Sequence, residues 1–239
     1  MNILIPMAGA GSRFEQAGYT DPKPLIKVKD KMMIQQVVDT MNIDANYVFV
    51  VQKSHYERYS LWNVLNHLVA PGCKIVQVDG VTEGAACTTL LAKEHINNDE
   101  PLIVSNSDHF MEWDSQGFLE AVKDVDCGIL TFEATGSKWS FVRLGEDGLV
   151  DLVAEKDPIS SIATAGIYYW KKGSDYVKYA EQMIENNTRI NGEFYVCPVF
   201  NEAIADGKKI KTFEAKKMWG LGTPEDLEYF LKHHVSDSS

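Results

Sequence analysis

The 239-residue sequence is poor in cysteine, has no excess of basic residues and contains no long hydrophobic run. Its four cysteines are widely scattered without metal-ligand spacing, which favours core thiols. Acidic residues outnumber basic ones by 34 to 23, and the net charge of −11 argues against a broad nucleic-acid-binding surface. The sequence shows no signal peptide and no apolar run of membrane-spanning length, so we expect a cytoplasmic protein without membrane contact.

Two well-known nucleotide-binding motifs are absent as well. No segment matches the P-loop pattern G-x-x-x-x-G-K-[ST]. The dinucleotide pattern G-x-G-x-x-G fails at its third glycine, where Phe14 stands. The strand expected over 47–51 leads into Gln52 and Lys53 instead of an acidic ribose-binding residue. Both kinds of site are therefore excluded.

The first 25 residues carry the strongest functional signal. A short apolar strand over 2–6 leads into the loop Met-Ala-Gly-Ala-Gly-Ser-Arg-Phe at 7–14, and Lys23 follows. Two glycines let backbone N–H groups approach phosphate oxygens, while Arg13 adds a planar fork of donors and Lys23 adds a point charge. These features predict a nucleoside triphosphate site, to which the loop contributes Ala8, Gly9, Ala10, Gly11 and Ser12. A tight strand-to-helix turn is the alternative explanation for the two glycines.

Apolar runs and amphipathic stretches alternate along the first half of the chain. We expect strands at 2–6, 47–51, 74–78, 102–105 and 127–133, and helices at 32–41, 54–69, 84–96 and 115–123. The second half predicts a β-hairpin (140–144 with 149–153), strands at 163–170 and 209–213, helices at 174–186, 196–206 and 224–234, and a frayed tail at 236–239. The expected N-caps are Ser54, Asp114 or Ser115, and Thr223. The predicted fold class is α/β, with one mostly parallel, Rossmann-like sheet flanked by helices and its ligand at the carboxyl ends of the first strands.

Asp108 follows the apolar strand at 102–105, which puts it at the carboxyl end of that strand, in the predicted ligand crevice. A hard cation such as Mg²⁺ binds one or two carboxylates together with substrate phosphates, so Asp108 is a candidate magnesium ligand. From spacing alone, an Asx-type turn leaving the strand explains this residue equally well.

The segments 6–14 and 22–28 resemble the signature of the sugar-1-phosphate nucleotidyltransferases, the nucleoside-diphosphate-sugar pyrophosphorylases. Later markers recur in the family's order, so the resemblance covers nearly the whole chain. It implies a single domain over 1–239 of the nucleotide-diphospho-sugar transferase type, with a nucleotide-binding half at 1–130 and an acceptor-binding half at 131–239. It also implies that Asp108 is the metal-binding aspartate.

The resemblance implies further nucleotide contacts after the third strand. Gly84 resembles the glycine with which the family's backbone approaches the base and ribose. Asp79 falls where the family often has a base-contacting glutamine, so this departure leaves the choice of base open. A plain helix N-cap at Thr82 or Glu83 explains the same segment nearly as well.

On the acceptor side, Glu155 and Lys156 lie in a segment that resembles the family's Glu-Lys-Pro motif with one residue inserted. The resemblance implies that Lys156 contacts the acceptor phosphate and Glu155 the sugar hydroxyls, although such a loop pair is usually solvated surface. Gly166 lies in a strand that resembles the one flanking the sugar pocket, and Glu193 resembles a glutamate that holds a sugar hydroxyl. A plain turn at Asn191-Gly192 and a first-turn preference of Glu193 are the alternatives.

One marker departs from the family. Many members carry Trp-Leu-Asp-Thr-Gly-Thr near the end, and its aspartate is the second metal ligand. This chain has Trp-Gly-Leu-Gly-Thr-Pro at 219–224, which puts Gly220 in the place of that aspartate. The second ligand is therefore missing or supplied elsewhere. Asp226 is the nearest acid, but helix capping explains it adequately.

Together these features predict a nucleotidyltransferase in which Arg13 and Lys23 are catalytic. It would join a nucleoside triphosphate to a sugar 1-phosphate or similar phosphorylated acceptor with Mg²⁺ and release pyrophosphate. The family implies a place in polysaccharide or glycan precursor synthesis. The alternatives are a nucleotide-sugar-dependent glycosyltransferase of the related fold and a non-catalytic nucleotide-sugar-binding protein. A homo-oligomer also stays open, because Tyr56, Tyr59 and Trp62 share one expected helix, with buried packing as the other explanation.

Overall fold

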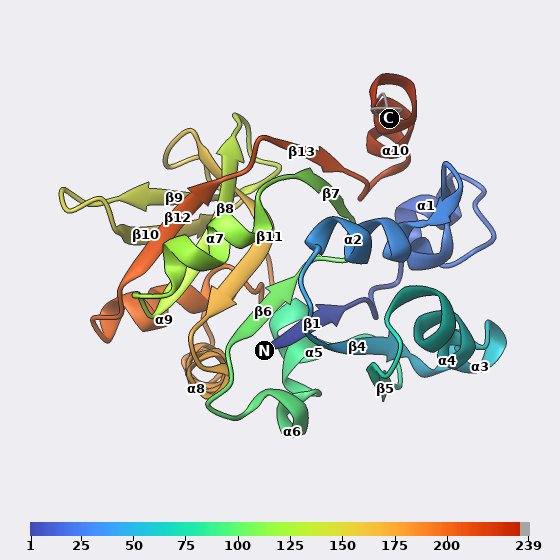
Figure 1. Cartoon of the computed structure of the whole chain (residues 1–239), viewed down its shortest axis with the longest axis horizontal. Helices are drawn as coiled ribbons and strands as arrows, with labels where there is room; N and C mark the ends of the chain where they lie inside the picture. The colour runs from blue at the N-terminus through green and yellow to red at the C-terminus, as the bar shows by residue number, and fades with distance from the viewer. Residues whose placement is uncertain (235–239) are drawn as a thin grey trace.

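The computed structural model of the chain describes residues 1–234, so the tail expected to fray at 236–239 lies outside the described residues. Its centre is one nine-stranded sheet with helices on both faces (Figure 1). The strands of this sheet are β1 (Asn2–Pro6), β4 (Asn46–Gln52), β5 (Lys74–Val78), β6 (Leu102–Ser105), β8 (Cys127–Glu133), β9 (Ser140–Leu144), β10 (Val150–Glu155), β11 (Ile162–Trp170) and β12 (Ile210–Glu214). The main path runs β10-β9-β11-β6-β1-β4-β5. β8 branches from this path at β11, and β12 pairs with β8.

The sheet combines a parallel part with an antiparallel part. β1 pairs in parallel with β4 and β6, and β4 pairs in parallel with β5, as the alternation of strands and helices predicts. β11 pairs antiparallel with β6 on one side and with β8 and β9 on the other, so it separates β8 from the parallel strands. The predicted fold class, including the hairpin of β9 and β10, is confirmed.

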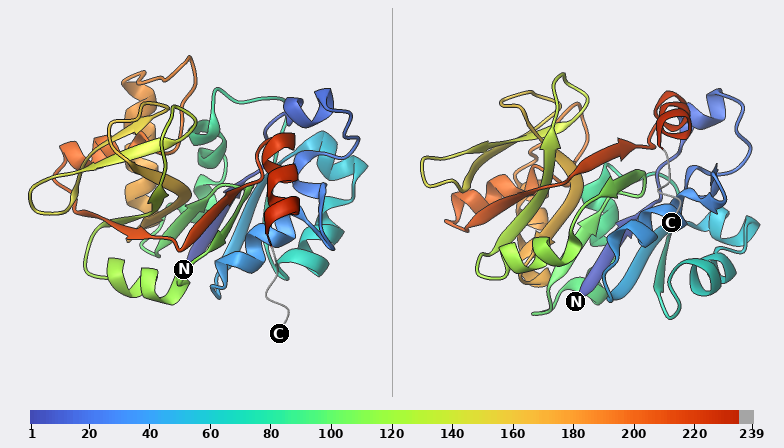
Figure 2. Two further views of the ribbon diagram at one scale, coloured as in Figure 1. Left: turned by 90° about the horizontal axis from the view of Figure 1, so that it is seen from above. Right: turned by 45° about the horizontal axis from the view of Figure 1, so that its top comes forward.

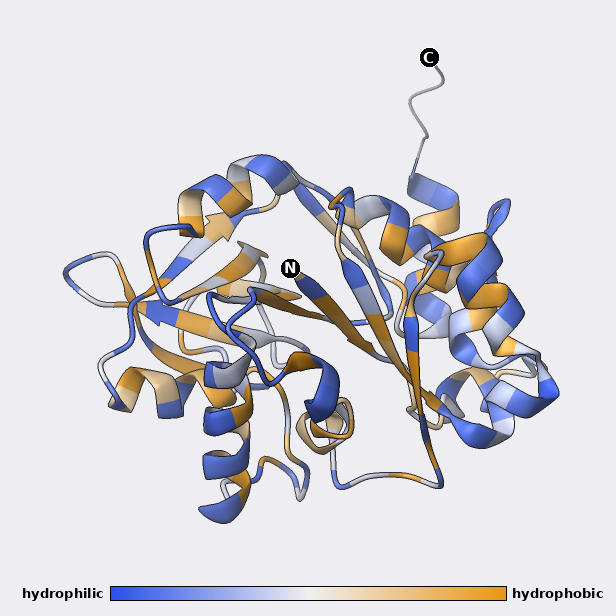
Figure 3. Cartoon of the chain, turned by 60° about the horizontal axis from the view of Figure 1, so that its bottom comes forward, coloured by the Kyte–Doolittle hydropathy of each residue, from blue (hydrophilic) through white to orange (hydrophobic). Residues whose placement is uncertain are grey.

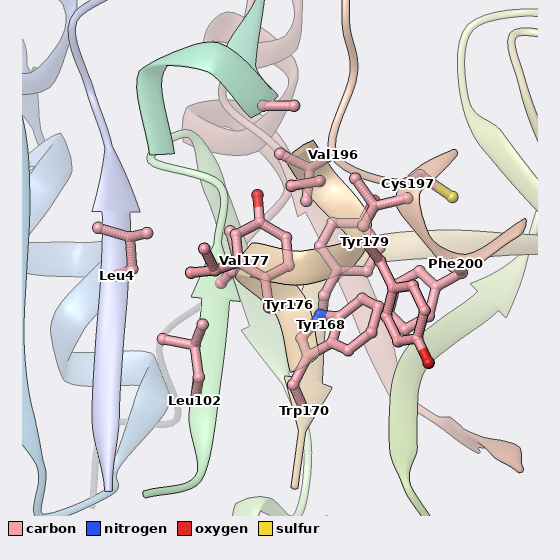
Figure 4. Close-up of a cluster of buried hydrophobic side chains, with 14 of the residues drawn as sticks. Leu4, Leu102, Tyr168, Trp170, Tyr176, Val177, Tyr179, Val196, Cys197 and Phe200 are labelled. Carbon is pink, nitrogen blue, oxygen red and sulfur yellow. The ribbon is translucent and has the colours of Figure 1, made fainter. Parts of the chain in front are cut away.

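Alternate residues of the central strands face two separate hydrophobic cores. In β1, Leu4 belongs to one core, whereas Ile3 and Ile5 belong to the core on the opposite face. In the first core, Trp170 of β11 stacks on Phe200 with ring centroids 4.5 Å apart (Figure 4). Figure 3 shows the apolar strands enclosed between helical layers whose outer faces are hydrophilic. Burial on both faces explains why these strands are continuous apolar runs.

Two expected helices are interrupted. The segment 54–69 is divided at Ser60, whose φ of 49° is left-handed. The pieces are α3 (Lys53–Arg58), α4 (Leu61–Asn63) and a π-helical turn (Val64–Val69). The segment 84–96 forms α5 (Ala85–Leu90) and α6 (Lys93–Ile96). The aromatic cluster is split by the first break: Tyr56 and Tyr59 pack on the second core, whereas Trp62 is half-exposed.

The remaining helices follow the expected pattern, with α2 (Met33–Met41), α7 (Ser115–Val122), α8 (Gly173–Glu185), α9 (Val199–Ala205) and α10 (Pro224–His233). Asp114 caps α7 and Thr223 caps α10 through their side chains, as predicted. The expected cap at Ser54 is wrong, because α3 begins one residue earlier and Gln52 is its N-cap. No helix within residues 1–234 has the length and hydrophobicity needed to cross a bilayer.

Residues from distant parts of the chain meet in a third core. α1 (Ser12–Gln16) and the 3₁₀ turn η1 (Lys23–Leu25) lie beside α10 (Figure 2), and Phe14, Ile26, Trp219 and Phe230 are buried between them. β13 (Lys217–Gly220) leads into α10 and pairs with β7 (His109–Glu112), outside the main sheet. A second small ladder joins β2 (Lys27–Val28) and β3 (Lys31–Met32). No sequence pattern predicted these two small sheets.

Candidate active site

A cavity of about 600 Å³ lies at the carboxyl ends of β1 and β6. Its walls come from the segments 6–14 and 106–108, parts of 81–85 and 193–197, and side chains that include Lys23, Ser140, Glu155 and Tyr168. The volume suits a small-molecule ligand or cofactor. One cavity thus brings together the predicted phosphate loop, the predicted metal ligand and two predicted acceptor residues, Glu155 and Glu193.

Gly11, the second glycine of the predicted phosphate loop, lies beside Lys23. Gly11 has a left-handed φ of 66°, and a β-carbon added there would lie 3.4 Å from Cβ of Lys23. The Gly11 carbonyl accepts hydrogen bonds from the N–H groups of Phe14 (3.0 Å) and Glu15 (3.3 Å), which begin α1. Arg13 is exposed in α1 and borders the cavity. The glycine turn therefore brings Arg13 and Lys23 to the same end of the cavity.

Lys23 and Asp108 form an ion pair at that end. Lys23 Nζ lies 2.5 Å from Asp108 Oδ2, and the two side chains are 23% and 21% exposed. Burial by itself raises the pKa of Asp108, but the charges of Lys23, His109 and Lys138 outweigh burial and lower the pKa to about 2. Asp108 is therefore ionised at neutral pH, as a carboxylate that binds a cation must be.

The backbone behind Asp108 leaves room for its carboxylate. A β-carbon added at Gly222 would lie 2.9 Å from Asp108 Oδ2, closer than a side-chain carbon can approach. The preceding residue, Leu221, donates its N–H to the Asp108 carbonyl at 2.8 Å. The segment between β13 and α10 thus packs directly against the predicted metal ligand, and a side chain at position 222 would force that carboxylate to shift.

Among the described residues 1–234, Asp108 is the carboxylate that this end of the cavity offers to a metal ion. Within residues 1–234, no three Asp, Glu, His or Cys side chains are grouped as a metal site requires. Gly220 brings no carboxylate, and Asp226 is engaged by the hydroxyl of Thr223 (2.8 Å) and by Nζ of Lys138 (2.5 Å). Because Mg²⁺ keeps several waters and binds through one or two carboxylates plus substrate phosphates, Asp108 fits this ion only together with a bound triphosphate.

Gln52, at the end of β4, is marked by no sequence motif. Its side-chain amide Nε2 donates hydrogen bonds to the carbonyls of Ala8 (2.6 Å) and Gly80 (2.7 Å), and the residue is buried. It therefore ties the phosphate loop to the loop that follows β5. The available signal in the sequence is a polar residue at the carboxyl end of a buried strand.

The loop after β5 is also hydrogen-bonded to the segment around Phe194, on the side of the cavity predicted to bind the acceptor. Phe194 N donates to the Glu83 carbonyl (2.9 Å), and Ala86 N donates to the Phe194 carbonyl (3.0 Å). Gly84 borders the cavity with a φ of 141°, and a β-carbon there would collide with the backbone of Phe194. Arg189 adds an ion pair with Glu83 (2.5 Å) and lies over the ring of Phe194. The two sides of the cavity therefore share one hydrogen-bonded junction.

The end of the cavity predicted to bind the acceptor is rich in hydroxyl and carboxylate groups. The hydroxyl of Ser140 donates to the carboxylate of Glu155, and Tyr168 also borders the cavity. Burial raises the pKa of Glu155 and Glu193 adds to this effect, whereas Ser140 and Lys156 oppose it. Such a set of donors and acceptors suits a ligand that carries several hydroxyl groups.

Two predicted site residues lie outside the cavity wall. Asp79 is 84% exposed and faces Lys53, with Nζ and Oδ1 separated by 3.9 Å. Gly166 has a left-handed φ of 77° and packs behind Asn106, where a β-carbon would lie 2.6 Å from Nδ2. In the structure, Gly166 therefore supports a residue of the cavity wall without bordering the cavity.

Lys156 also lies outside the wall but contacts a residue that forms it. Its backbone is left-handed, with φ of 57°, and Nζ donates to the hydroxyl of Tyr195 at 2.5 Å. Glu193 reaches the cavity from a tight turn in which Asn191 and Gly192 have φ of 50° and 84°. The expected turn is thus present, and it presents Glu193 to the site.

A parallel α/β sheet with a glycine-rich loop, two cations and an ionised aspartate at its carboxyl edge is the architecture of a nucleotide-binding enzyme. The chain belongs to the nucleotidyl transferase family, whose profile matches residues 3–234. The family resemblance of the sequence is thereby confirmed.

Two curated relatives share this length of sequence. The chain is 24% identical over 236 residues to the bifunctional protein GlmU of Methanocaldococcus jannaschii. It is 24% identical over 234 residues to the low-salt glycan biosynthesis nucleotidyltransferase Agl11 of Haloferax volcanii. Each match covers 95% of this chain but only 52% and 64% of the respective relative, so the chain spans a little over half the length of these proteins.

Solved structures show the same fold. A nucleoside-diphosphate-sugar pyrophosphorylase from Vibrio cholerae RC9 superposes with a TM-score of 0.84 at 25% identity, covering 97% of this chain and 100% of that one. A UDP-glucose pyrophosphorylase complexed with UDP-glucose gives a TM-score of 0.75 at 20% identity, with 97% of each chain covered.

Proposed function

We propose that this protein transfers a nucleotidyl group from a nucleoside triphosphate to a sugar 1-phosphate or similar phosphorylated acceptor and releases pyrophosphate. The observation that carries this proposal is the single cavity that joins the phosphate loop and Lys23 to Glu155 and Glu193. Membership of the nucleotidyl transferase family and similarity to a nucleoside-diphosphate-sugar pyrophosphorylase support it. The triphosphate binds the half at 1–130, and the acceptor binds the half at 131–239.

In the proposed reaction, an oxygen of the acceptor phosphate forms a bond to the α-phosphorus of the triphosphate. The bond between the α-phosphorus and the bridging oxygen breaks, and pyrophosphate leaves with that electron pair. An ionised phosphate is already nucleophilic, so the step requires no general base. Catalysis then consists of positioning and of stabilising the negative charge that develops on the phosphates.

The triphosphate end of the cavity supplies the positive groups for this step. Backbone N–H groups of the loop 8–12 bind phosphate oxygens, Arg13 stabilises the departing pyrophosphate and Lys23 binds the α-phosphate. Asp108 would hold Mg²⁺ together with the triphosphate, and the ion would neutralise phosphate charge. The ionised state of Asp108 supports this assignment.

The acceptor end supplies orientation. Lys156, beside Tyr195 at the cavity wall, binds the acceptor phosphate, and Glu155 and Glu193 bind its hydroxyl groups. Asp79 lies outside the cavity wall whereas Gly84 borders it, so the loop around Gly84 is expected to contact the base. A reaction that consumes a nucleoside triphosphate suits the cytoplasm, and its product would supply glycan or polysaccharide synthesis.

The proposal is tested by measuring pyrophosphate release with Mg²⁺, using CTP, UTP, dTTP, GTP and ATP against a panel of sugar 1-phosphates and other phosphorylated acceptors. Acceptor-dependent release with one triphosphate would establish the reaction and both substrates. Absence of release across the panel, with binding of a nucleotide-sugar retained, would favour a glycosyltransferase or a non-catalytic binding protein.

A further inference from the structure

Lys138 belongs to no recognised sequence motif. It lies near Gly220, the position at which many family members carry the second metal-binding aspartate. Gly220 of β13 pairs with His109 of β7, and Leu221 donates its N–H to the carbonyl of Asp108. Position 220 therefore lies beside Asp108 in the fold, although the two residues are far apart in the sequence.

Two side chains bound the space next to Gly220. A β-carbon added there would lie 3.5 Å from Cγ of Asp226 and 3.5 Å from Cη2 of Trp139. Asp226 belongs to the first turn of α10, and Trp139 belongs to the loop between β8 and β9. A side chain at position 220 would therefore lie between Asp226 and Trp139, the residue next to Lys138.

Lys138 is oriented from two directions. Its Nζ lies 2.5 Å from Oδ1 of Asp226 and 4.7 Å from the ring centroid of Trp139. The other carboxylate oxygen of Asp226 accepts the hydroxyl hydrogen of Thr223 at 2.8 Å, so the acid itself is fixed. The Lys138 side chain remains 48% exposed, which leaves its ammonium accessible to a ligand.

The segment that carries Lys138 lies between the two phosphate-binding regions of the proposed reaction. On one side, the ring of Trp139, the residue after Lys138, has its centroid 6.1 Å from that of His109, which follows Asp108. On the other side, the carbonyl of Trp139 accepts the N–H of Lys156 at 3.0 Å. The residue that follows Lys138 therefore contacts both the neighbour of the expected metal ligand and the expected acceptor-phosphate lysine.

We propose that Lys138 is a third phosphate-binding cation of this site and that Asp226 positions it. The inference rests on the proposed function and adds a catalytic residue to it. Lys138 donates hydrogen bonds to non-bridging oxygens of the reacting phosphates, near Gly220, a position that brings no carboxylate to the site. A fixed positive group aimed at developing phosphate charge stabilises the transition state. Asp226 acts only through Lys138.

The test compares Lys138→Ala and Lys138→Arg with Lys178→Ala. Lys178 is a matched control because its Nζ pairs with Asp206 at 2.7 Å, lies 4.6 Å from the ring centroid of Tyr179 and belongs to a side chain that is 55% exposed. Three quantities are measured for each variant: kcat for pyrophosphate release, the affinity for inorganic triphosphate with Mg²⁺ by calorimetry, and the melting temperature.

We expect Lys138→Ala to lower kcat by about 10- to 100-fold, with Lys138→Arg recovering most of this loss and Lys178→Ala unchanged. Both alanine variants lose one exposed ion pair, so their melting temperatures are expected to fall by similar small amounts. If Lys138→Ala matches Lys178→Ala in kcat and in triphosphate affinity, the pair with Asp226 only anchors α10 and the inference is wrong. If the wild type releases no pyrophosphate, the proposed function fails, and the affinities for inorganic triphosphate alone decide whether Lys138 binds phosphate.

Discussion

Lys23 and Asp108 are separated by 85 positions in the sequence, yet Nζ of one lies 2.5 Å from Oδ2 of the other. This contact joins the end of the phosphate loop to the end of β6, the two places where parallel strands deliver polar groups to the same edge of the sheet. The lysine and the carboxylate therefore share one location at the edge of the cavity.

Removal of the lysine tests its proposed action on the α-phosphate. Lys23→Ala is expected to lower kcat by about 100-fold or more and to raise KM for the triphosphate by a smaller factor, because the charge acts mainly in the transition state. Steady-state pyrophosphate release measures both constants, and Lys27→Ala, at an exposed position four residues along, is the control. A Lys23→Ala protein with wild-type kcat would contradict this role.

A methyl group at Gly222 is expected to displace the Asp108 carboxylate. Gly222→Ala would put a β-carbon 2.9 Å from Oδ2, whereas Gly220→Ala would meet its neighbours at 3.5 Å, an ordinary contact distance. We expect Gly222→Ala to lose at least about tenfold in kcat/KM and about 1 kcal/mol of unfolding free energy, with Gly220→Ala close to wild type. Equal activities of the two variants would show that the carboxylate position is not critical.

The junction between the two sides of the cavity depends on Gly84. Gly84→Ala combines φ of 141° and ψ of 172°, a region that only glycine readily adopts, with a collision against the backbone of Phe194, whereas Gly136→Ala has a left-handed φ of 85° and open space around it. We expect the unfolding free energy to fall by about 1 kcal/mol for Gly136→Ala and by about 3 kcal/mol for Gly84→Ala. Urea denaturation measures both, and equal losses would mean that the backbone at Phe194 moves away freely.

The pKa of Asp108 predicts how stability changes in acid. Its pKa in the folded protein is about 2, below the ordinary value of 3.8, so the unfolded chain takes up the proton first as the pH falls. The ionised Asp108 carboxylate therefore contributes its full stabilisation of the folded protein above about pH 3.8, and this contribution is lost as the pH falls toward about 2. In this window, Asp108→Asn is expected to lose stability less steeply than the wild type in denaturant titrations. Parallel curves would contradict the lowered pKa.

Local sequence patterns predicted where the loop 8–12, Lys23 and Asp108 lie, at the carboxyl edge of the sheet. The Gly11 turn and Lys23 are close in sequence, and Asp108 follows a buried strand, so short-range rules suffice to place them. The alternation of strands and helices likewise predicted the parallel part of the sheet. These features depend on backbone geometry that neighbouring residues determine.

Features that depend on distant contacts were not predictable in this way. The break at Ser60 carries no glycine or proline, so periodicity alone extends the helix through it. The contacts of Gln52 and Lys138 require the loop after β5 and helix α10 to be in place. Asp79 resembles a base-contacting position, but its own loop directs it to solvent. Such contacts are determined by tertiary packing that no single segment encodes.

The third hydrophobic core has a consequence for the order in which this protein matures during translation. Phe14 and Ile26, which support Arg13 and Lys23, pack against Trp219 and Phe230. During translation, Phe14 and Ile26 are synthesised near the beginning, whereas Trp219 and Phe230 are synthesised near the end. A nascent chain therefore carries its complete phosphate loop long before the surface that supports it exists, and affinity for triphosphate is expected to arise only after α10 has left the exit tunnel.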